Sequence, residues 1–302
     1  MEHNHNHSHG HHELSGKNIG IAVFLNIVIT VSQLIGGIIS GSVALLTDAL
    51  HNFSDVISLL LSYFTSRIAR KKPTTKQTFG YKRAEILSAF VNSATLIAIA
   101  IFLIVEAVKR FSQTETILSD LVIWFAAGSI VINFVSVLLL HKDAKESMNM
   151  KSAYLHLLTD VMTSIAVMLG GILMKFYNIY LIDSILSILI AIYLIFSSYK
   201  ILISSIKIIM EFTPQEVDIY DIRDEINCIE SVKNIHHLHI WQINEKSLFL
   251  EAHIDLEKDI KISDFQKILS KTEKILAKSN ITHFNIQPEF NKNCRKQLIV
   301  EH

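Results

Sequence analysis

Long apolar segments alternate with short polar ones up to about residue 205 of the chain. A helix needs about 20 mostly apolar residues to cross a bilayer, because its backbone groups must find their hydrogen-bond partners within the helix. Six segments have this length, so the pattern predicts a multi-pass α-helical membrane protein with six transmembrane helices. They run from Asn18 to Ile39, Ser42 to Arg67, Ala84 to Val108, Leu118 to Leu140, Met150 to Met174 and Leu181 to Ser205.

After Pro214 the pattern becomes that of a small soluble domain. Along one segment, one set of residues is predicted to face the core and the alternate set to form a polar face. The inward set is Leu248, Leu250, Ala252, Ile254 and Leu256, and the polar face is Phe249, Glu251, His253 and Asp255. We expect a small α+β domain of ferredoxin-like, metallochaperone-like type. Its predicted elements are a helix (Glu216 to Cys228), two strands (Ile235 to Ile243 and Leu248 to Leu256), a helix (Asp264 to Lys278) and a strand (Thr282 to Glu289).

The predicted domains are a His-rich tail (1–16), a transmembrane domain (17–206), a cytoplasmic α+β domain (207–290) and a C-terminal tail (291–302). Lys and Arg number 28, and so do Asp and Glu, so no charge excess points to nucleic acid. Cys228 and Cys294 give no basis for a disulfide scaffold, which fits a reducing cytoplasm. The first dozen residues lack an apolar core, so we expect no cleaved signal peptide.

Basic residues in the short loops predict the orientation, because such loops resist translocation. They concentrate between the second and third spans and between the fourth and fifth. Both termini should therefore lie in the cytoplasm, with the protein in the cell membrane, or in the inner membrane of a cell that has two. The basic residues are Arg67, Arg70, Lys71, Lys72, Lys76, Lys82 and Arg83 in the first loop, and Lys142, Lys145 and Lys151 in the second.

Two spans carry the same polar motif, His-x-x-x-Asp. The second contains His51 and Asp55, and the fifth contains His156 and Asp160. Four residues make about one helical turn, a rise of ~6 Å, so each pair projects from one face. Two imidazoles and two carboxylates form a tetrahedral site suited to zinc, whereas an all-oxygen cage would favour magnesium, calcium or manganese. The alternative is hydrogen-bonded links between helices; the repeated spacing favours metal.

Asp48 lies one turn before His51 on the same face. It could be a supporting acceptor, a relay for protons or metal, or a polar residue near the outer interface, and the sequence leaves these open. Metal binding needs neutral imidazole and ionised carboxylate, so protons compete with metal. A site of this composition can therefore couple a metal gradient to a proton gradient.

Histidines are also frequent outside the spans. The N-terminal histidines could gather metal near the entrance, or be a tag without a role in turnover. In the soluble domain we expect candidate regulatory metal ligands at His236, His253, His283 and Glu289, and strand alternation predicts that His236 faces away from His237 and His239. The N-terminal histidines are His3, His5, His7, His9, His11 and His12.

The chain closely resembles the cation diffusion facilitators, and within them the zinc exporters. The resemblance extends from the first span to about Glu289. It rests on Leu-Thr-Asp-Ala-Leu-His-Asn-Phe-Ser-Asp (46–55), Phe-Gly-Tyr-Lys-Arg-Ala-Glu-Ile-Leu-Ser-Ala-Phe-Val-Asn (79–92), His-Leu-Leu-Thr-Asp (156–160), His-Leu-His-Ile-Trp (237–241) and Ile-Gln-Pro-Glu (286–289).

This resemblance implies a homodimer, alternating access, metal–proton antiport, and His51, Asp55, His156 and Asp160 as transport ligands. It also implies cytoplasmic metal positions at His236, His253 and Glu289. The chain departs from the family at Gln287, where some members have His, and at 236–239, where His-Asp-Leu-His becomes His-His-Leu-His.

We therefore expect a zinc efflux transporter rather than an enzyme, with cadmium, cobalt and iron(II) as further candidate ions and protons as counter-ion. Two other classes are less consistent with the sequence. A membrane metalloenzyme of the di-iron type would need more histidines at the membrane edge. A metal sensor that never transports would not need two His–Asp pairs within the spans.

Overall fold

The computed structural model describes residues 13–69, 71–111, 116–141, 148–244, 247–291 and 297–299. The N-terminal histidines, Cys294 and the predicted tail after 299 lie outside these residues. Residue contacts divide the chain into two units, described separately below. One comprises Met1–Leu61 and Asn92–Lys200, and the other comprises Ser62–Val91 and Ile201–His302.

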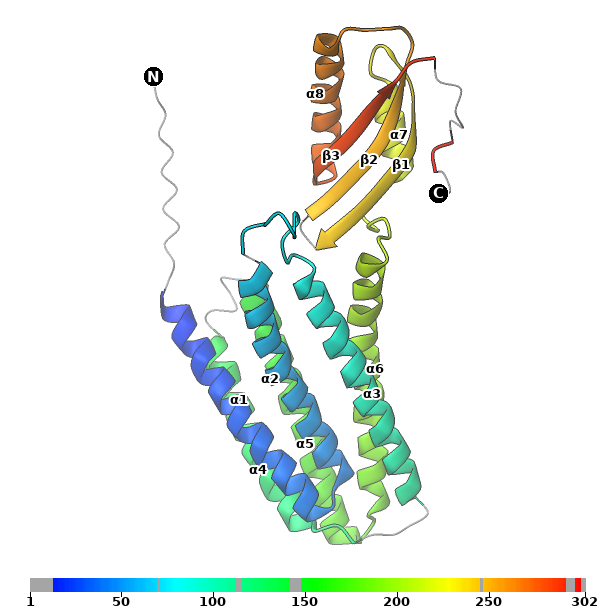
Figure 1. The fold of residues 1–302 in the computed structure, drawn as a ribbon. Helices are drawn as coiled ribbons and strands as arrows, with labels where there is room; N and C mark the ends of the chain where they lie inside the picture. The colour runs from blue at the N-terminus through cyan, green and yellow to red at the C-terminus, as the bar shows by residue number, and fades with distance from the viewer. Residues whose placement is uncertain are drawn as a thin grey trace. The chain divides into compact units, whose positions relative to one another are not determined.

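Long helices dominate the first unit (Figure 1). They are α1 (Glu13–Ser40), α2 (Val43–Ala69), α3 (Ala84–Arg110), α4 (Ser119–Leu140), α5 (Met148–Tyr177) and α6 (Leu181–Ile209). By length and composition, α1 and α3 to α6 are able to cross a membrane, and they make this a multi-pass membrane protein. The sixth long helix of the described chain, α2, carries His51 and Asp55. Each predicted span lies within one of these helices or exceeds it by one residue.

The N-terminus of α2 is fixed by a carboxylate from α6. The backbone N–H of Val43 donates to Oδ2 of Asp183 at 2.7 Å, and the Ser42 hydroxyl donates to Oδ1 at 2.5 Å. The Ser42 hydroxyl oxygen in turn accepts from the N–H of Leu45 at 3.0 Å. These acceptors satisfy N–H groups that the first turn of a helix leaves without partners, and the carboxylate interacts favourably with the helix dipole. The contact ties together two helices distant in sequence.

Small residues allow the helices of the first unit to approach closely. A Cβ atom placed on Gly37 of α1 would lie 3.0 Å from the backbone nitrogen of Leu46 in α2. A Cβ atom on Gly171 of α5 would lie 3.0 Å from the Ile123 side chain in α4. Small residues at such crossings are typical of helix packing in membranes, where van der Waals contact replaces the hydrophobic effect.

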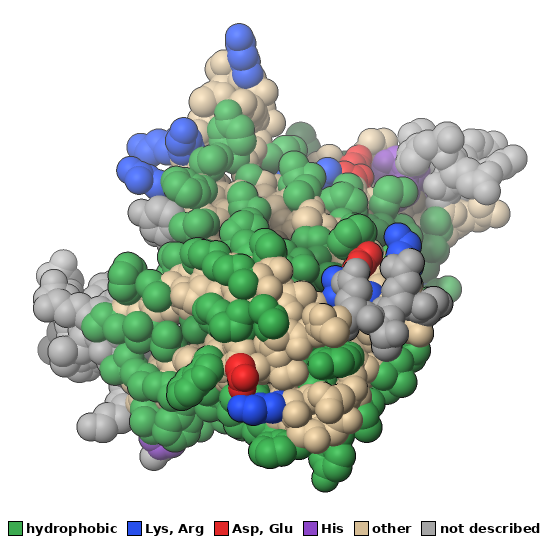
Figure 2. Space-filling model, turned by 90° about the horizontal axis from the view of Figure 1, so that it is seen from below, with side chains coloured by type: hydrophobic (Ala, Val, Ile, Leu, Met, Phe, Trp, Pro, Cys, Tyr) green, Lys and Arg blue, Asp and Glu red, His purple; other side chains and the backbone are tan. Residues whose placement is uncertain are grey.

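Large apolar side chains lie on the outside of these helices. Trp124 is 75% exposed and Phe196 is 71% exposed. Figure 2 shows hydrophobic side chains over much of the face in view, with charged groups scattered among them. Such a surface would be an aggregation liability in water and is the one that lipid tails solvate.

The second unit contains the predicted α+β domain, with α7 (Ile219–Asn227), β1 (Val232–Asn244), β2 (Ser247–Leu256), α8 (Ile262–Lys278) and β3 (Ile281–Glu289). The sheet order is β1-β2-β3; β1 pairs antiparallel with β2, and β3 pairs parallel with β2 after the crossover through α8. The five predicted inward residues of β2 are buried. Phe249 and Asp255, predicted on the polar face, are buried too, so both faces of β2 are partly covered.

Gly37→Ala should destabilise the helical unit, because the added methyl group meets backbone atoms that cannot rotate away. Overpacking of this kind typically costs about 1–3 kcal/mol. Gly128→Ala is the matched control, since its nearest neighbour would be a flexible side-chain atom at 3.9 Å. Thermal unfolding of the purified protein in detergent should give a lower midpoint for Gly37→Ala and an unchanged or higher one for Gly128→Ala. Equal midpoints would contradict the close α1–α2 crossing.

Candidate metal centres

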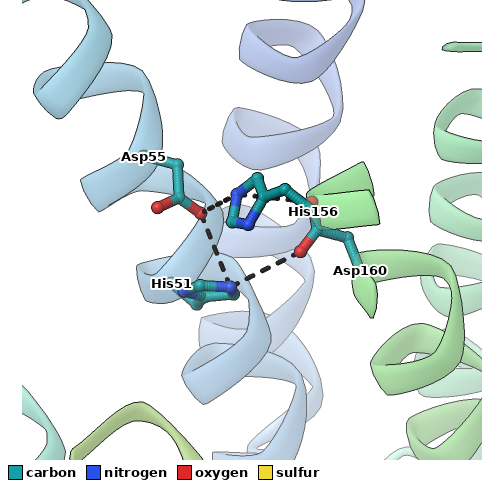
Figure 3. Close-up of side chains that lie close together, drawn as sticks. All are labelled: His51, Asp55, His156 and Asp160. Carbon is teal, nitrogen blue, oxygen red and sulfur yellow. Dashed lines mark ion pairs between the residues drawn. The ribbon is translucent and has the colours of Figure 1, made fainter. Parts of the chain in front are cut away.

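The two His-x-x-x-Asp motifs face each other across α2 and α5. His51 and Asp55 project from one helix and His156 and Asp160 from the other (Figure 3). Nε2 of His156 lies 3.1 Å from Oδ2 of Asp55, and Nε2 of His51 lies 3.4 Å from Oδ1 of Asp160. Each residue offers one potential ligand atom, and these four atoms all lie within 4.8 Å of one another. One small ion could therefore contact both helices.

Burial separates the four side chains. Asp160 is 0% exposed and His51 is buried, whereas the His156 side chain is 43% exposed. Both carboxylate oxygens of Asp160, and Oδ2 of Asp55, are buried without a hydrogen-bond donor of suitable geometry in the described chain. Buried carboxylates without donors carry a large desolvation cost. A cation reached from the His156 side would remove that cost.

The donor set has definite chemical preferences. Two imidazole nitrogens and two carboxylate oxygens suit zinc and neighbouring divalent transition metals better than magnesium or calcium, which prefer oxygen alone. The four described side chains include no thiol, so the site lacks the soft ligand that favours copper(I). The same four groups can take up protons, so one site can hold either metal or protons.

Asp48 is fully buried and lies outside the four-residue cluster. Its Oδ2 accepts from Nε2 of Gln33 in α1 at 2.6 Å and from the Ser164 hydroxyl in α5 at 3.0 Å, and its Oδ1 accepts from the Thr163 hydroxyl at 3.0 Å. The sequence left three interpretations of Asp48 open: a supporting acceptor, a relay, or a polar residue near the outer interface. These contacts favour the first, because Asp48 accepts hydrogen bonds that join α1, α2 and α5.

A second cluster lies in the α+β domain. His236 and Glu289 are buried, and Oε2 of Glu289 lies 3.2 Å from Nε2 of His236 while Oε1 lies 3.0 Å from Nδ1 of His253. These three residues come from β1, β3 and β2, and they could hold a metal ion between two imidazoles and a carboxylate. Gln287 donates from Nε2 to Oε1 of Glu289 at 3.2 Å.

The other histidines of this domain do not follow the strand alternation that was predicted for β1. A register shift between His236 and His239 interrupts strand alternation, and His237 has a positive φ of 52°. The His237 ring consequently stacks on His253 at a centroid distance of 4.4 Å, so both His236 and His237 contact His253. The prediction that they face apart was wrong, because a β-bulge re-aims side chains. His283 packs against Phe249 and lies outside the three-residue cluster.

Several polar residues around the transmembrane site were not singled out from the sequence. Gln33, Thr163 and Ser164 donate to Asp48, Asn52 donates to Gln33, and Asp183 caps α2. Their only sequence signal is a polar side chain within an apolar span. That signal does not distinguish a polar residue that contacts another helix from one that has no structural role in its span.

Comparison with known proteins agrees with this architecture. Residues 19–210 match the cation efflux transmembrane domain, and residues 214–290 match the cytoplasmic domain of cation efflux proteins. The boundary between the two matches falls close to the change in sequence pattern near Pro214.

Curated relatives match over most of their length. A cadmium, cobalt and zinc/H(+)-K(+) antiporter of Bacillus subtilis is 36% identical over 279 residues, which are 91% of this chain and 90% of the relative. The zinc transporter ZitB of Pectobacterium atrosepticum is 33% identical over 97% of this chain and 90% of its own. The metal cation efflux system protein CzcD of Cupriavidus metallidurans is 31% identical over 95% and 90%. With both domains matched and in order, the chain belongs to the cation efflux family, the cation diffusion facilitators.

Proposed function

We propose that this protein is a divalent metal–proton antiporter that carries zinc out of the cytoplasm, with His51, Asp55, His156 and Asp160 as its transport ligands. One observation carries the proposal: two His-x-x-x-Asp turns on different helices place four metal-binding atoms within 4.8 Å of one another. Family membership supports a transporter rather than an enzyme. The relatives are named as a cadmium, cobalt and zinc/H(+)-K(+) antiporter, a zinc transporter and a metal cation efflux system protein.

The ligand chemistry accounts for antiport. In the inward-facing state, neutral imidazoles and ionised carboxylates bind the ion, and any protons they held are released to the cytoplasm. The protein then changes to the outward-facing state, which exposes the loaded site to the side with the higher proton concentration. Protonation of the same nitrogens and oxygens removes the lone pairs that held the ion, so metal leaves and protons return. Binding of metal and binding of protons exclude each other, which couples their movements.

Selectivity follows from the same ligands. Two imidazoles favour zinc over magnesium and manganese, while cadmium, cobalt and iron(II) accept similar ligand sets. A carrier must also release its cargo, and carboxylates hold zinc less tightly than thiolates would. We therefore expect zinc as the main substrate and these three ions as weaker competitors.

The basic residues of the two loops support an orientation with both termini in the cytoplasm. In this orientation the His-rich N-terminal tail would gather metal beside the entrance of the transport site. The α+β domain would lie in the same compartment and join two copies of the chain into a homodimer, consistent with its match to the cytoplasmic domain of the family. The protein would then sit in the cell membrane, or in the inner membrane where there are two.

The cluster of His236, His253 and Glu289 is proposed as a regulatory zinc site of that cytoplasmic domain. Its donor set fits zinc, with two nitrogens and one carboxylate from three different strands. Zinc bound there would neutralise the buried charge of Glu289. Glu289 bridges the two histidines and so fixes β1 and β2 to β3 at this end of the sheet.

Asp160→Asn should abolish transport while leaving the fold intact, because it removes a carboxylate charge from the site at nearly constant size. The measurement is zinc-65 uptake into inverted membrane vesicles driven by an imposed proton gradient. Asp120→Asn is the matched control, since Asp120 is exposed and paired with Lys175. Uptake by the wild type that survives in Asp160→Asn would overturn the ligand assignment. A wild-type protein that binds zinc without uptake would leave a sensor as the better reading.

Lower pH should weaken zinc binding at the transport site. Protonation of imidazole and carboxylate competes with metal, so affinity is highest where both are deprotonated and falls as pH decreases. The purified protein for this test carries His236→Ala and Glu289→Gln, and Ala replaces the six histidines of the N-terminal tail, so that neither the cytoplasmic cluster nor the tail binds zinc. Equilibrium zinc titrations should give weaker affinity at about pH 6 than at about pH 7.5. An affinity independent of pH over this interval would contradict direct competition.

Glu289→Gln should remove metal from the cytoplasmic cluster, because a neutral amide replaces the carboxylate that bridges both histidines. Zinc content after equilibrium dialysis should fall by about one ion per chain. Glu273→Gln, which alters an exposed residue of α8, should leave the content unchanged. Identical zinc contents in both variants would show that the three residues form an ion-pair network without metal.

A further inference from the structure

Asp48 is the end point of hydrogen bonds that all run in one direction. Its three donors are the Gln33 amide, the Thr163 hydroxyl and the Ser164 hydroxyl. Ser164 has one hydroxyl hydrogen, and when it points to Asp48 the Ser129 hydroxyl, 2.9 Å away, must donate to Ser164. Ser129 in turn accepts from Nδ2 of Asn133 at 3.3 Å. Dipoles from α1, α4 and α5 thus converge on one buried carboxylate of α2.

The same network reaches the proposed transport ligands. Oε1 of Gln33 accepts from Nδ2 of Asn52, the residue after His51, at 2.9 Å. The Thr163 hydroxyl has one hydrogen, and two acceptors lie within reach of it: Oδ1 of Asp48 at 3.0 Å and the backbone carbonyl oxygen of Asp160 at 2.9 Å. Asp48 is therefore linked to α2 beside His51 through Gln33, and to α5 beside Asp160 through Thr163.

These contacts distinguish Asp48 from a ligand. Both of its oxygens already accept hydrogen bonds, whereas the buried oxygens of Asp160 have no donor of suitable geometry in the described chain. In an apolar bilayer no water is at hand to replace a lost partner, so a buried carboxylate with three donors holds those donors in place. Residues behind metal ligands commonly set affinity by fixing ligand orientation.

We propose that Asp48 is a positioning residue of the transport site, which fixes His51 and Asp160 relative to each other through Gln33 and Thr163 and thereby sets the affinity for metal. The inference rests on the proposed transport function. It assigns to Asp48 a role in holding the ligands, and not in binding or carrying the ion. Gln33 is its obligatory partner, because its amide both donates to Asp48 and accepts from Asn52.

The first test is Asp48→Asn in the full-length chain, with zinc uptake into inverted vesicles measured over a range of zinc concentrations. Asn has nearly the same shape but offers one acceptor oxygen in place of two, so its NH2 group faces either the donors Gln33 and Ser164 or the donor Thr163, and the carboxylate charge is lost. We expect the KM for zinc to rise about 10-fold or more, the usual scale for loss of a residue supporting metal ligands, with a smaller change in maximal rate. Asp120→Asn should leave KM unchanged.

The second test exchanges the two partners. Gln33→Glu alone sets a second carboxylate against Asp48, where the present atoms are 2.6 Å apart, and should raise KM as Asp48→Asn does. In the double variant Gln33→Glu/Asp48→Asn, the Asn amide can donate to the new carboxylate, which can still accept from Asn52. The double variant should therefore recover a KM within about 3-fold of wild type, a non-additivity expected only of directly coupled residues.

Thr163→Val provides a variant that keeps the Asp48 charge and should still raise KM, even where Asp48→Asn fails to fold. The inference would be overturned by an unchanged KM in Asp48→Asn, or in Thr163→Val if Asp48→Asn does not fold. It would also be overturned if the KM of the double variant were at least as high as that of the more impaired single variant. If the wild type takes up zinc and Asp160→Asn does not, the proposed transport function stands, whatever the Asp48 variants show. Absence of wild-type uptake would instead reject that function itself.

Discussion

The cost of burying charge in a bilayer constrains this structure more than any other interaction. An ionised side chain within the apolar region is unfavourable by several kcal/mol unless it is paired, hydrogen-bonded or hydrated. The first unit buries Asp48, Asp160 and Asp183 together with His51. Each must be compensated by the protein or by a bound cation, and the way in which each is compensated separates structural roles from transport.

Asp183 and Asp48 are compensated by the protein. Asp183 accepts hydrogen bonds at the N-terminus of α2, and Asp48 accepts them from α1 and α5. Asp160 differs, because its oxygens lie close to histidine nitrogens but lack hydrogen bonds of suitable geometry. A polar group that the fold leaves unsatisfied at such cost is a candidate for function. Here the adjacent imidazoles make a divalent cation, exchangeable with protons, the fitting partner.

The helices and strands, and the candidate ligands, could be predicted from the sequence for a physical reason. Spanning helices are set by length and apolarity, and the rarity of ionisable residues within them made His51, Asp55, His156 and Asp160 conspicuous. The α+β domain followed from alternation in β2. Those signals are local, and each is carried by a few residues at fixed spacing.

The parts that escaped sequence reasoning depend on contacts between distant segments. Nothing near Gln33 indicates that it meets Asp48, and nothing near Asp183 indicates that it caps α2. The bulge at His237 likewise breaks an alternation that the sequence of β1 gives no reason to doubt, and His283 proved to pack against Phe249 instead of joining the cluster. A backbone irregularity of one residue moves every side chain beyond it to the other face.

The most direct test of the central claim is zinc K-edge X-ray absorption on the protein in lipid nanodiscs, with one zinc added per chain. The protein carries His236→Ala and Glu289→Gln, and Ala replaces the six histidines of the N-terminal tail, so that neither the cytoplasmic cluster nor the tail competes for the ion. We expect a four-coordinate ion with two imidazole ligands and two oxygen ligands. When His156 is also replaced by Ala, the contribution of one imidazole should be lost. A spectrum without imidazole, or one that His156→Ala leaves unchanged, would contradict the proposed site.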